Sequence, residues 1–555
     1  MINAIRDIGH YLKENNGVSE QDIVRSLVNK IEGNSINEIL TIDIKDNSEI
    51  ITNSEEFYSE ITTKALYYQS GNGALGGALR ADFFKDEEKE KQKFDKKIKN
   101  TLTYCGEEDK YDEVRKIIYE KIKNQGKNFF VVILKNGRYP YEIFKNKFLD
   151  KMYSTTYKRI SNKHICHFCS KKGEVFNTTT YKFYTNDKEV YGSIDNKEKF
   201  GVVMCKNCLN DVLIGKKYVE DKLTTYWIGK NVMFIPHDFN EELESIYENS
   251  TLTSDDKKNF ISNISQDEEL VLEMLGSGNT ETDIIFFEKD ANKTFYIYHT
   301  IKSMLPSRFG ELANYLKKYK LKLYKIIEYS TAIKGGTKGI ETTDKEKLRI
   351  VEAIFTGRKI QRNLFFTRAM MVYKQDYING NSKFTSENIG KVYNFLVETG
   401  CLKGGFDVMT KYEDYKDLFN NNPSYFDINE KKAWFLIGMA YNYINYRIKK
   451  QNSMEEGKLA DKTSLDKNFF FARKFDFKDF IYFFNLLSDK TIKYNINSPW
   501  LKEITTDAKL FMANQNGKLS SDEAKYIFFW GIDSNFKKSY EREGNNEDIK
   551  NGEDN

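Results

Sequence analysis

The chain has 555 residues, too many for one hydrophobic core, and this length predicts about three or four domains. Its 86 basic and 82 acidic side chains leave a formal net charge of only +4, so the whole chain is not a polycation that wraps around nucleic acid. No apolar run approaches the ~18 residues of a membrane-spanning helix, and Asp7 interrupts any signal-peptide core. We therefore expect a cytoplasmic globular protein without membrane contact, in which any binding of nucleic acid is local.

Residues 1–160 are predicted to form an α/β domain. Apolar residues recur at helical spacing from Ile2 to Leu12, and the unbroken apolar run Phe129–Leu134 is typical of a buried strand. Between them lies the glycine-rich segment Gln69–Arg80, which lacks the Gly-Lys-Ser/Thr of a phosphate-binding loop. It could be a plain flexible turn, or its backbone could approach DNA closely. In the second interpretation, the side chains within reach of DNA are Gln69, Asn72 and Arg80.

Two Cys-x-x-Cys pairs, Cys166/Cys169 and Cys205/Cys208, hold four of the six cysteines. Each pair offers two thiolates across a tight turn, so together they can close the sulfur tetrahedron of a structural zinc site. Redox pairs and buried free thiols are the alternatives, but a thioredoxin-like site needs only one pair. Because protein fills all four positions, none remains for a catalytic water, and we predict structural Zn²⁺.

The zinc module is predicted to span residues 161–225. Its two cysteine pairs lie farther apart than is usual, so we expect an inserted hairpin over Thr178–Ile194. His164 and His167 flank the first pair. Either could replace one cysteine as a ligand, although such a histidine is more often a neighbour of the site or simply solvated.

Residues 226–384 are predicted to form a mixed α+β domain. Ile284–Phe287 and Thr294–Tyr298 flank a turn and predict a β-hairpin. Tyrosines and lysines alternate over Tyr315–Lys325, a pattern shared by single-strand grooves and solvated amphipathic helices. A further helix is predicted over Lys345–Tyr373, with two arginines one turn apart on one face.

Arginines carry more weight than lysines as candidate nucleic-acid contacts in this domain. Lysine outnumbers arginine by 72 to 14, and A/T-rich codons could account for much of that excess. The planar arginine fork, by contrast, matches phosphates and base edges. The predicted contacts here are Arg308, Lys318, Lys322, Arg358 and Arg362.

Residues 385–536 are predicted to form a helical bundle. Asp427–Gly438 and Ser520–Gly531 share one pattern, a capping box with glutamate at its fourth position and a glycine eight residues later. This repetition predicts two helices that enter one bundle with similar packing, the glycines permitting close approach. Residues 537–555 are polar and acidic and are predicted to be disordered.

In its order of motifs, the chain resembles the large subunit of the type I-B CRISPR interference complex, Cascade. The resemblance covers nearly the whole chain and rests on the N-terminal helix, the glycine-rich segment, Gly137-Arg138-Tyr139-Pro140, the cysteine pairs, Leu305-Pro306-Ser307-Arg308 and the two Glu-to-Gly helices. It implies a subunit that binds the protospacer-adjacent motif, helps to open the duplex and holds the displaced strand. It also implies backbone subunits and guide RNA as partners, and a separate helicase-nuclease that cuts the DNA.

The same resemblance implies that the C-terminal region is like the small subunit of the complex. In this family an internal start can produce that region separately, and Met409, after Gly404-Gly405, is well placed for one. The alternative, that Met409 is an ordinary methionine in a linker, has somewhat more support, because a protein sequence shows no ribosome-binding site.

Two other classes of function have weaker support. His237-Asp238 is similar to the His-Asp pair of metal-dependent nucleases, but such a site needs further histidines, and the chain has only five. Gly335-Gly336 precedes Thr337 and Lys338, not the metal-binding aspartates of nucleotide cyclases. A stand-alone zinc-containing DNA-binding regulator would show a helix-turn-helix or a strongly basic helix. We therefore predict a mostly helical, multidomain α+β large subunit without catalytic residues.

Overall fold

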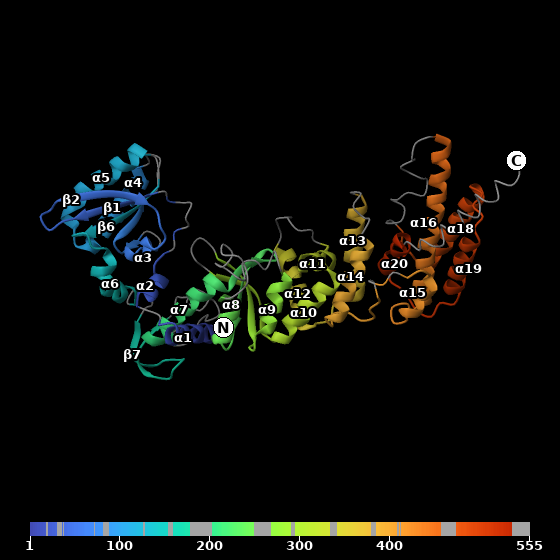
Figure 1. Ribbon diagram of the computed structural model, residues 1–555, viewed down its shortest axis with the longest axis horizontal. Coiled ribbons are helices and arrows are strands. Elements are labelled where there is room, and N and C mark those ends of the chain that lie inside the picture. Colours follow the sequence, from blue (N-terminus) through green and yellow to red (C-terminus); the bar gives the residue numbers. More distant parts are fainter. Residues whose placement is uncertain are drawn as a thin grey trace, which may run out of the picture. The chain divides into compact units, whose positions relative to one another are not determined.

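The computed structural model divides the chain into two compact units (Figure 1). The first consists of Met1–Asn263 and Gly278–Ser303, and the second of Ile264–Ser277 and Met304–Asn555. Helices predominate, so the predicted class, α+β and mostly helical, is confirmed. Within the described part of the chain, no helix is long and apolar enough to cross a membrane. The described residues are 1–17, 20–29, 31, 36, 38–70, 73–81, 88–125, 128–153, 159–177, 202–248, 268–289, 295–332, 341–378, 385–407, 410, 412–456 and 473–534.

Several sequence predictions concern residues outside these ranges. They are the hairpin inserted over 178–194, the segment 335–338, Met409 and the C-terminal tail 537–555. The predicted domain boundaries near residues 160, 225 and 384 also stay predictions, since the contacts divide the chain only into the two units above.

A four-stranded sheet in the order β2-β1-β6-β5 forms the core of the N-terminal part of the first unit. β1 and β6 are parallel, and the outer strands pair antiparallel. The predicted strand Phe129–Leu134 is confirmed and fully buried, because apolar side chains pack on both faces of the sheet. The elements are β1 (Glu38–Ile44), β2 (Ile50–Glu56), α3 (Ile61–Lys64), β5 (Ala78–Ala81), α4 (Glu88–Cys105), α5 (Tyr111–Gln125), β6 (Phe129–Lys135) and α6 (Pro140–Lys151).

The glycine-rich segment forms a short hairpin and then a sharp bend. β3 (Tyr68–Ser70) pairs with β4 (Gly73–Leu75). At the bend Gly76 has a φ of +103°, and a Cβ there would lie 1.8 Å from the carbonyl oxygen of Leu66. A Cβ on Gly77 would lie 2.2 Å from Cγ of Pro140. The packing of the first unit therefore requires these two glycines, whether or not the hairpin contacts a ligand.

The N-terminal helix α1 (Ile2–Asn15) crosses α7 (Lys206–Lys222) at a pair of glycines. A Cβ on Gly9 would lie 1.7 Å from the carbonyl oxygen of Asp211, and one on Gly215 would lie 1.8 Å from that of Ile5. The two backbones are thus in direct contact. The sequence analysis places α1 within residues 1–160, and in the structure this helix packs on α7, which contains Cys208.

Two further sheets complete the first unit. The order β10-β11-β12-β13 makes β12 and β13 neighbours, which confirms the hairpin predicted at these strands. The other sheet, β7-β8-β9, carries the cysteines. The elements are α2 (Glu20–Leu27), β7 (Arg159–Ile165), β8 (Lys172–Asn177), β9 (Val203–Met204), β10 (Thr224–Trp227), β11 (Lys230–Pro236), α8 (Glu241–Glu248), β12 (Thr282–Lys289) and β13 (Phe295–Met304).

The described part of the second unit is built from helices. The single helix predicted over Lys345–Tyr373 is wrong, because α12 ends at Thr356 and Gly357 has a φ of +71°, which an α-helix does not accommodate. The helices are α9 (Glu268–Ser277), α10 (Pro306–Tyr319), α11 (Leu323–Thr331), α12 (Glu341–Thr356), α13 (Arg362–Ile378), α14 (Thr385–Glu398), α15 (Tyr415–Asn421), α16 (Asn429–Glu456), α18 (Phe477–Lys493), α19 (Pro499–Ala513) and α20 (Ser521–Asp533).

Helices α16 and α20 cross at the two glycines that the sequence pattern singles out. The Cα atoms of Gly438 and Gly531 face each other, and a Cβ on either residue would lie 3.2 Å from the other Cα. A Cβ on Gly438 would lie 2.1 Å from the carbonyl oxygen of Phe528. The predicted close approach of these helices is confirmed.

The close contact at Gly438 predicts that a larger side chain there destabilises the protein. Gly438→Ala should lower the thermal unfolding midpoint of the protein by about 2–10 °C, since overpacking of about 1–3 kcal/mol outweighs the gain in helix propensity. Gly310→Ala is the matched control, because this helical glycine of the same unit has no atom within 4 Å of an added Cβ. The control should keep or raise the midpoint. A higher midpoint for Gly438→Ala would contradict the crossing.

Candidate metal centre and nucleic-acid interface

The first cysteine pair lies in a tight turn between β7 and β8. The backbone N–H of Ser170 donates to the carbonyl oxygen of Cys166 at 3.0 Å, and that of Cys166 donates to Lys171 at 2.9 Å. Ser170 adopts a left-handed φ of +57°, which reverses the chain directly after Cys169. The turn therefore directs both thiols of the pair to the same side.

The second pair lies where β9 leads into α7. Cys205 is the N-cap of this helix, and Cys208 lies in its first turn. β9 pairs with β8, and the backbone N–H of His167 donates to the carbonyl oxygen of Val203 at 3.1 Å. The sheet thus brings together two turns that are distant in the sequence.

The four sulfur atoms converge to within 4.8 Å of one another, and the Sγ atoms of Cys169 and Cys205 are 3.7 Å apart. Zinc–sulfur bonds of about 2.3 Å in a tetrahedron place sulfur atoms about 3.8 Å apart, so the cluster fits this metal. All six cysteines of the chain are free thiols. The four cysteines predicted from the sequence can therefore hold one metal ion together, and the identity of that ion as zinc stays a prediction.

The packing of the cluster shifts the pKa values of its thiols in opposite directions. Burial raises the pKa of Cys166, but backbone N–H groups of Cys169, Cys205 and Phe168 outweigh burial and lower it to about 7. Burial raises the pKa of Cys208, and the neighbouring thiols raise it further. A metal ion would relieve this mutual repulsion, because each thiol loses its proton when it binds the ion.

Neither flanking histidine belongs to the cluster as described. His167 is exposed, and His164 lies in β7 opposite Gly173. Arg6 of α1 contacts the cysteine turn instead: its guanidinium donates to the carbonyl oxygen of Phe168 at 3.3 Å and lies over the ring of this residue. Helix α1 therefore supports the metal centre from one side, which the sequence does not indicate.

The side chains predicted to contact DNA from the glycine-rich segment are only partly described. Arg80 lies half-buried in β5, Gln69 lies in β3 without a described side chain, and Asn72 is outside the described residues. Their contact with DNA stays a prediction.

Arg308 has an internal structural position. Its guanidinium donates to the carbonyl oxygen of Phe355 at 3.1 Å and to that of Thr399 at 2.7 Å. It thus binds carbonyl groups at the C-terminal ends of α12 and α14. Lys318 pairs with Glu398, and Lys322 lies at the turn before α11.

Arg358 and Arg362 do not share a helical face, contrary to the prediction, because the chain leaves α12 at Gly357 and α13 starts only at Arg362. The Arg358 side chain is 68% exposed and lies 3.2 Å from Glu352. Arg362 points into the bundle, where its Nε donates to Glu523 at 3.1 Å. Of the two, only Arg358 is placed to meet a ligand from solvent.

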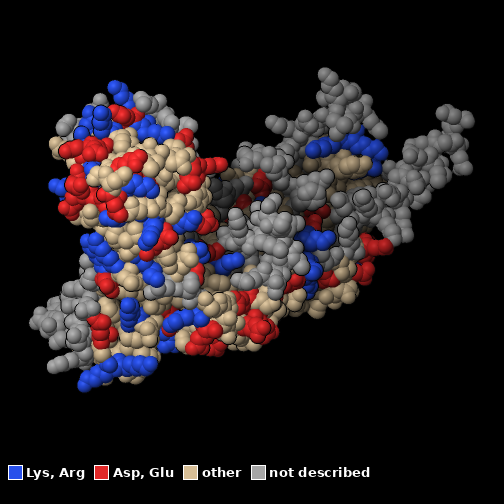
Figure 2. Space-filling model, turned by 60° about the vertical axis from the view of Figure 1, so that its left-hand side comes forward, with Lys and Arg blue, Asp and Glu red and all other residues tan. Residues whose placement is uncertain are grey.

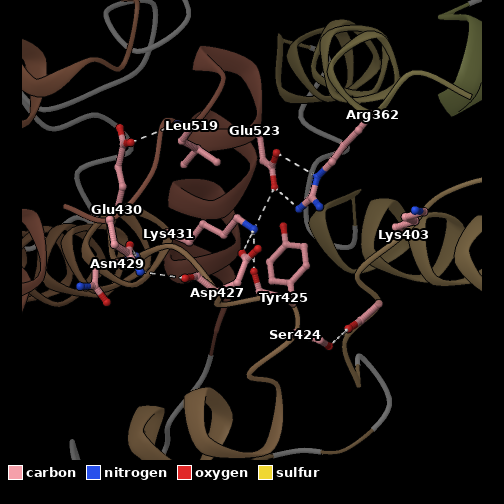
Figure 3. A network of polar contacts seen from close by, with 12 residues as sticks. Arg362, Lys403, Ser424, Tyr425, Asp427, Asn429, Glu430, Lys431, Leu519 and Glu523 are labelled. Carbon is pink, nitrogen blue, oxygen red and sulfur yellow. Dashed lines mark hydrogen bonds and ion pairs between the residues drawn. The ribbon is translucent and has the colours of Figure 1, made fainter.

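Figure 3 shows Arg362 and Lys431 approaching Glu523 from opposite sides. The side chains of Glu523 and Lys431 are 4% and 2% exposed, and the ring of Tyr425 lies against both cations. Burial lowers the pKa of Lys431 despite the adjacent carboxylate. This network joins α13, α16 and α20 in the interior of the second unit.

The predicted capping boxes are only half correct. Ser520 caps α20, since its hydroxyl accepts from the backbone N–H of Glu523 at 3.3 Å. The glutamate side chains contact other elements of the bundle. Glu523 binds Arg362, and Glu430 accepts from the backbone N–H of Leu519 at 3.2 Å. Both carboxylates thus connect elements of the bundle.

Arg138 is an exposed arginine of the first unit that is not among the nucleic-acid contacts predicted from the sequence. Arg138 follows Asn136 and Gly137, which have φ values of +53° and +77° at the carboxyl end of the parallel strands β1 and β6. The turn is fixed by the Gly137 N–H, which donates to Asp43 at 2.8 Å. The pair Asn136-Gly137 is the sequence signal for this turn. Basic and acidic side chains are interspersed over much of the face shown in Figure 2.

Two family models match the chain. The central domain of CRISPR-associated protein TM1802 matches residues 163–304, which include the metal centre, and the C-terminal domain of that protein matches residues 321–546. Together the two spans cover more than half of the chain. The chain is therefore a CRISPR-Cas large subunit, and the resemblance seen in its sequence is confirmed. It belongs to the CRISPR-associated protein TM1802 family. No curated protein matches the chain.

Loss of one cluster cysteine should remove the metal. Cys166→Ser or Cys205→Ser should reduce bound zinc from about one equivalent to near zero and increase protease cleavage near residues 160–225, since apparent zinc binding contributes ~10–16 kcal/mol in small modules. Metal analysis of the purified protein measures the first effect. Cys401→Ala, in the other unit, should keep the metal. Less than about half an equivalent of zinc in the unaltered protein would contradict the site.

The buried ion network predicts different effects for two neighbouring arginines. Arg362→Ala should lower the stability of the second unit by about 3–5 kcal/mol, because Glu523 loses its closest partner inside the bundle. Arg358→Ala should change it by less than about 0.5 kcal/mol. Denaturant unfolding of both variants measures this difference. Lost nucleic-acid binding with unchanged stability in Arg362→Ala would show instead that Arg362 contacts the ligand.

Proposed function

We propose that the chain is the large subunit of a type I-B CRISPR RNA-guided DNA surveillance complex. In this role it recognises the protospacer-adjacent motif, helps to open the target duplex and holds the displaced strand. The observation that carries the proposal is the match of two family domains along the chain. Because guide RNA reads the target sequence by base pairing, the protein needs only to read the short flanking motif and to bind strands.

The partners follow from this role. They are the backbone subunits of the complex, the guide RNA, the target duplex with its displaced strand, and a separate helicase-nuclease. The complex acts in the cytoplasm. Within the chain, the cysteine cluster holds Zn²⁺ as a structural ion, because four sulfur ligands leave no position for a reactive water.

We also propose that the chain supplies no catalytic residues. The nuclease candidate His237-Asp238 has structural partners that support this view. Nε2 of His237 lies 3.0 Å from Oδ1 of Asp283, and Nδ1 lies 3.7 Å from Glu281. Both imidazole nitrogens thus face carboxylates, and the backbone N–H of Asp238 donates to the hydroxyl of Thr280 at 3.0 Å.

A separate C-terminal product starting near Met409 would lose part of its packing. Trp530 of α20 lies against Phe406, with ring centroids 4.6 Å apart, and Phe529 lies 4.5 Å from Tyr373. Both partners precede Met409. A small subunit made this way would therefore need another surface to cover α20, and the covalent domain is the better supported form.

Co-expression tests the proposed function. The chain should copurify with the backbone subunits and guide RNA, and a complex prepared without it should bind matched target duplex at least about tenfold more weakly. Tight binding by the complex without the chain would contradict the role. Failure to copurify, with specific duplex binding by the chain alone, would favour the zinc-containing regulator.

The purified complex then tests motif recognition by the glycine-rich segment. Asn72→Ala should weaken binding to duplex with the correct flanking motif by about tenfold and spare targets already melted there, because a base contact matters only where duplex is read. Asn47→Ala, in the exposed β1–β2 turn, is the matched control. Equal losses of binding to duplex and to melted targets would show that the glycine-rich segment does not read the motif.

A further inference from the structure

Arg6 of helix α1 lies beside the cysteine cluster, although it precedes Phe168 by 162 residues in the sequence. Its guanidinium lies over the ring of Phe168, with 5.6 Å between Cζ and the ring centroid, and Nη1 donates to the carbonyl oxygen of Phe168 at 3.3 Å. The Arg6 side chain is only 25% exposed, so water and salt screen its charge weakly. A mostly buried arginine therefore contacts the turn between the two cysteines of the first pair.

The contact of Arg6 extends through one peptide group to a predicted metal ligand. The carbonyl group of Phe168 and the N–H of Cys169 belong to the same planar peptide bond. The backbone N–H of Cys169 is directed at the sulfur of Cys166, together with those of Phe168 and Cys205. A donor at the carbonyl end of an amide polarises it and strengthens the hydrogen bond at its N–H end. Arg6 therefore acts on the Cys166 sulfur through the intervening peptide group.

The positive charge of Arg6 also suits the cluster. Four thiolates carry more negative charge than one Zn²⁺ ion compensates, so the cluster with its ion would be an anion. Arg6 lies close enough to Cys208 and Asp211 to interact with both electrostatically. Its Nε donates to Oδ1 of Asp7 at 2.8 Å, and this contact orients the planar guanidinium. The arginine thus offers its charge to the second cysteine pair and a hydrogen bond to the turn of the first.

Two other basic side chains of α1 contact a different part of α7. Nζ of Lys13 lies 3.2 Å from Oδ1 of Asp211, and Nδ1 of His10 lies 3.4 Å from Oδ2 of the same carboxylate. These contacts help to attach α1 to α7. Lys13 is therefore a matched comparison for Arg6, because its partner is a carboxylate of α7 and not the cysteine turn.

We propose that Arg6 is a positioning residue of the metal centre. It fixes the peptide group between Phe168 and Cys169 so that the N–H points at Cys166, and it offsets the excess negative charge of the four thiolates. The inference rests on the proposed structural zinc and makes retention of the ion depend on the N-terminal helix. Because coupling between two binding events is reciprocal, the bound ion in turn holds α1 in place.

Competition with a chromophoric zinc chelator measures the role of Arg6 in the full-length protein. Arg6→Gln should weaken zinc binding by about tenfold, since groups that orient metal ligands typically change affinity about 10–100-fold. Lys13→Gln removes one charge from the same helix and should change zinc binding less than about twofold. Arg6→Lys keeps the charge without the planar fork and should fall between the two. Equal weakening by Arg6→Gln and Lys13→Gln would show that only the docking of α1 matters and would overturn the proposal.

Thermal unfolding with and without metal separates this role from simple packing of α1. The stabilisation by zinc is the difference between the unfolding midpoints of zinc-loaded and chelator-treated protein, and it should be smaller in Arg6→Gln than in the unaltered chain. Equal stabilisation in both proteins would overturn the proposal, and Arg6→Lys supplies the comparison if Arg6→Gln does not fold. Unaltered protein that binds no zinc would overturn the zinc site and this inference together, whereas equally tight zinc in all variants would overturn this inference alone.

Discussion

The metal centre depends on helix α7, because this helix contacts both the cysteine cluster and the N-terminal helix α1. Its N-cap Cys205 and first-turn residue Cys208 belong to the cysteine cluster, and Gly215 lies directly against the backbone of α1. Arg6 of α1 in turn contacts the turn that carries Cys166 and Cys169. A tetrahedral ion would fix the start of α7, and the glycine contact fixes its axis. The cysteine cluster, α1 and α7 are therefore connected into one structural element.

In the described part of the second unit, backbone contact and buried charged groups fix the packing of the helices. Backbone contact at Gly438 and Gly531 sets the distance between α16 and α20, and a buried carboxylate with two cations sets their register against α13. Such an arrangement favours one packing, because Glu523 would lack its cations in any shifted one. Arg358, by contrast, lies outside this interior, and its side chain is 68% exposed after the end of α12.

Features that depend on local chemistry could be predicted from the sequence, whereas features that depend on distant partners could not. The spacing of Cys166, Cys169, Cys205 and Cys208 is enough to predict their cluster, and the Glu-to-Gly repeat is enough to predict the α16–α20 contact. Arg362 fits a phosphate contact in the sequence, because nothing there reveals that Glu523, 161 residues later, binds it. The helix break after Thr356 falls at Gly357, but a glycine within a helical pattern does not by itself show that its φ is positive.

X-ray absorption at the zinc edge, on full-length protein purified without added metal, tests the central claim that four cysteines anchor this subunit around one structural ion. Four sulfur neighbours at about 2.3 Å, with no nitrogen or oxygen in the coordination shell, is the predicted result. A shell that contains nitrogen would place His164 or His167 among the ligands and contradict the four-sulfur cluster. Absence of zinc from folded, binding-competent protein would contradict the structural role of the metal altogether.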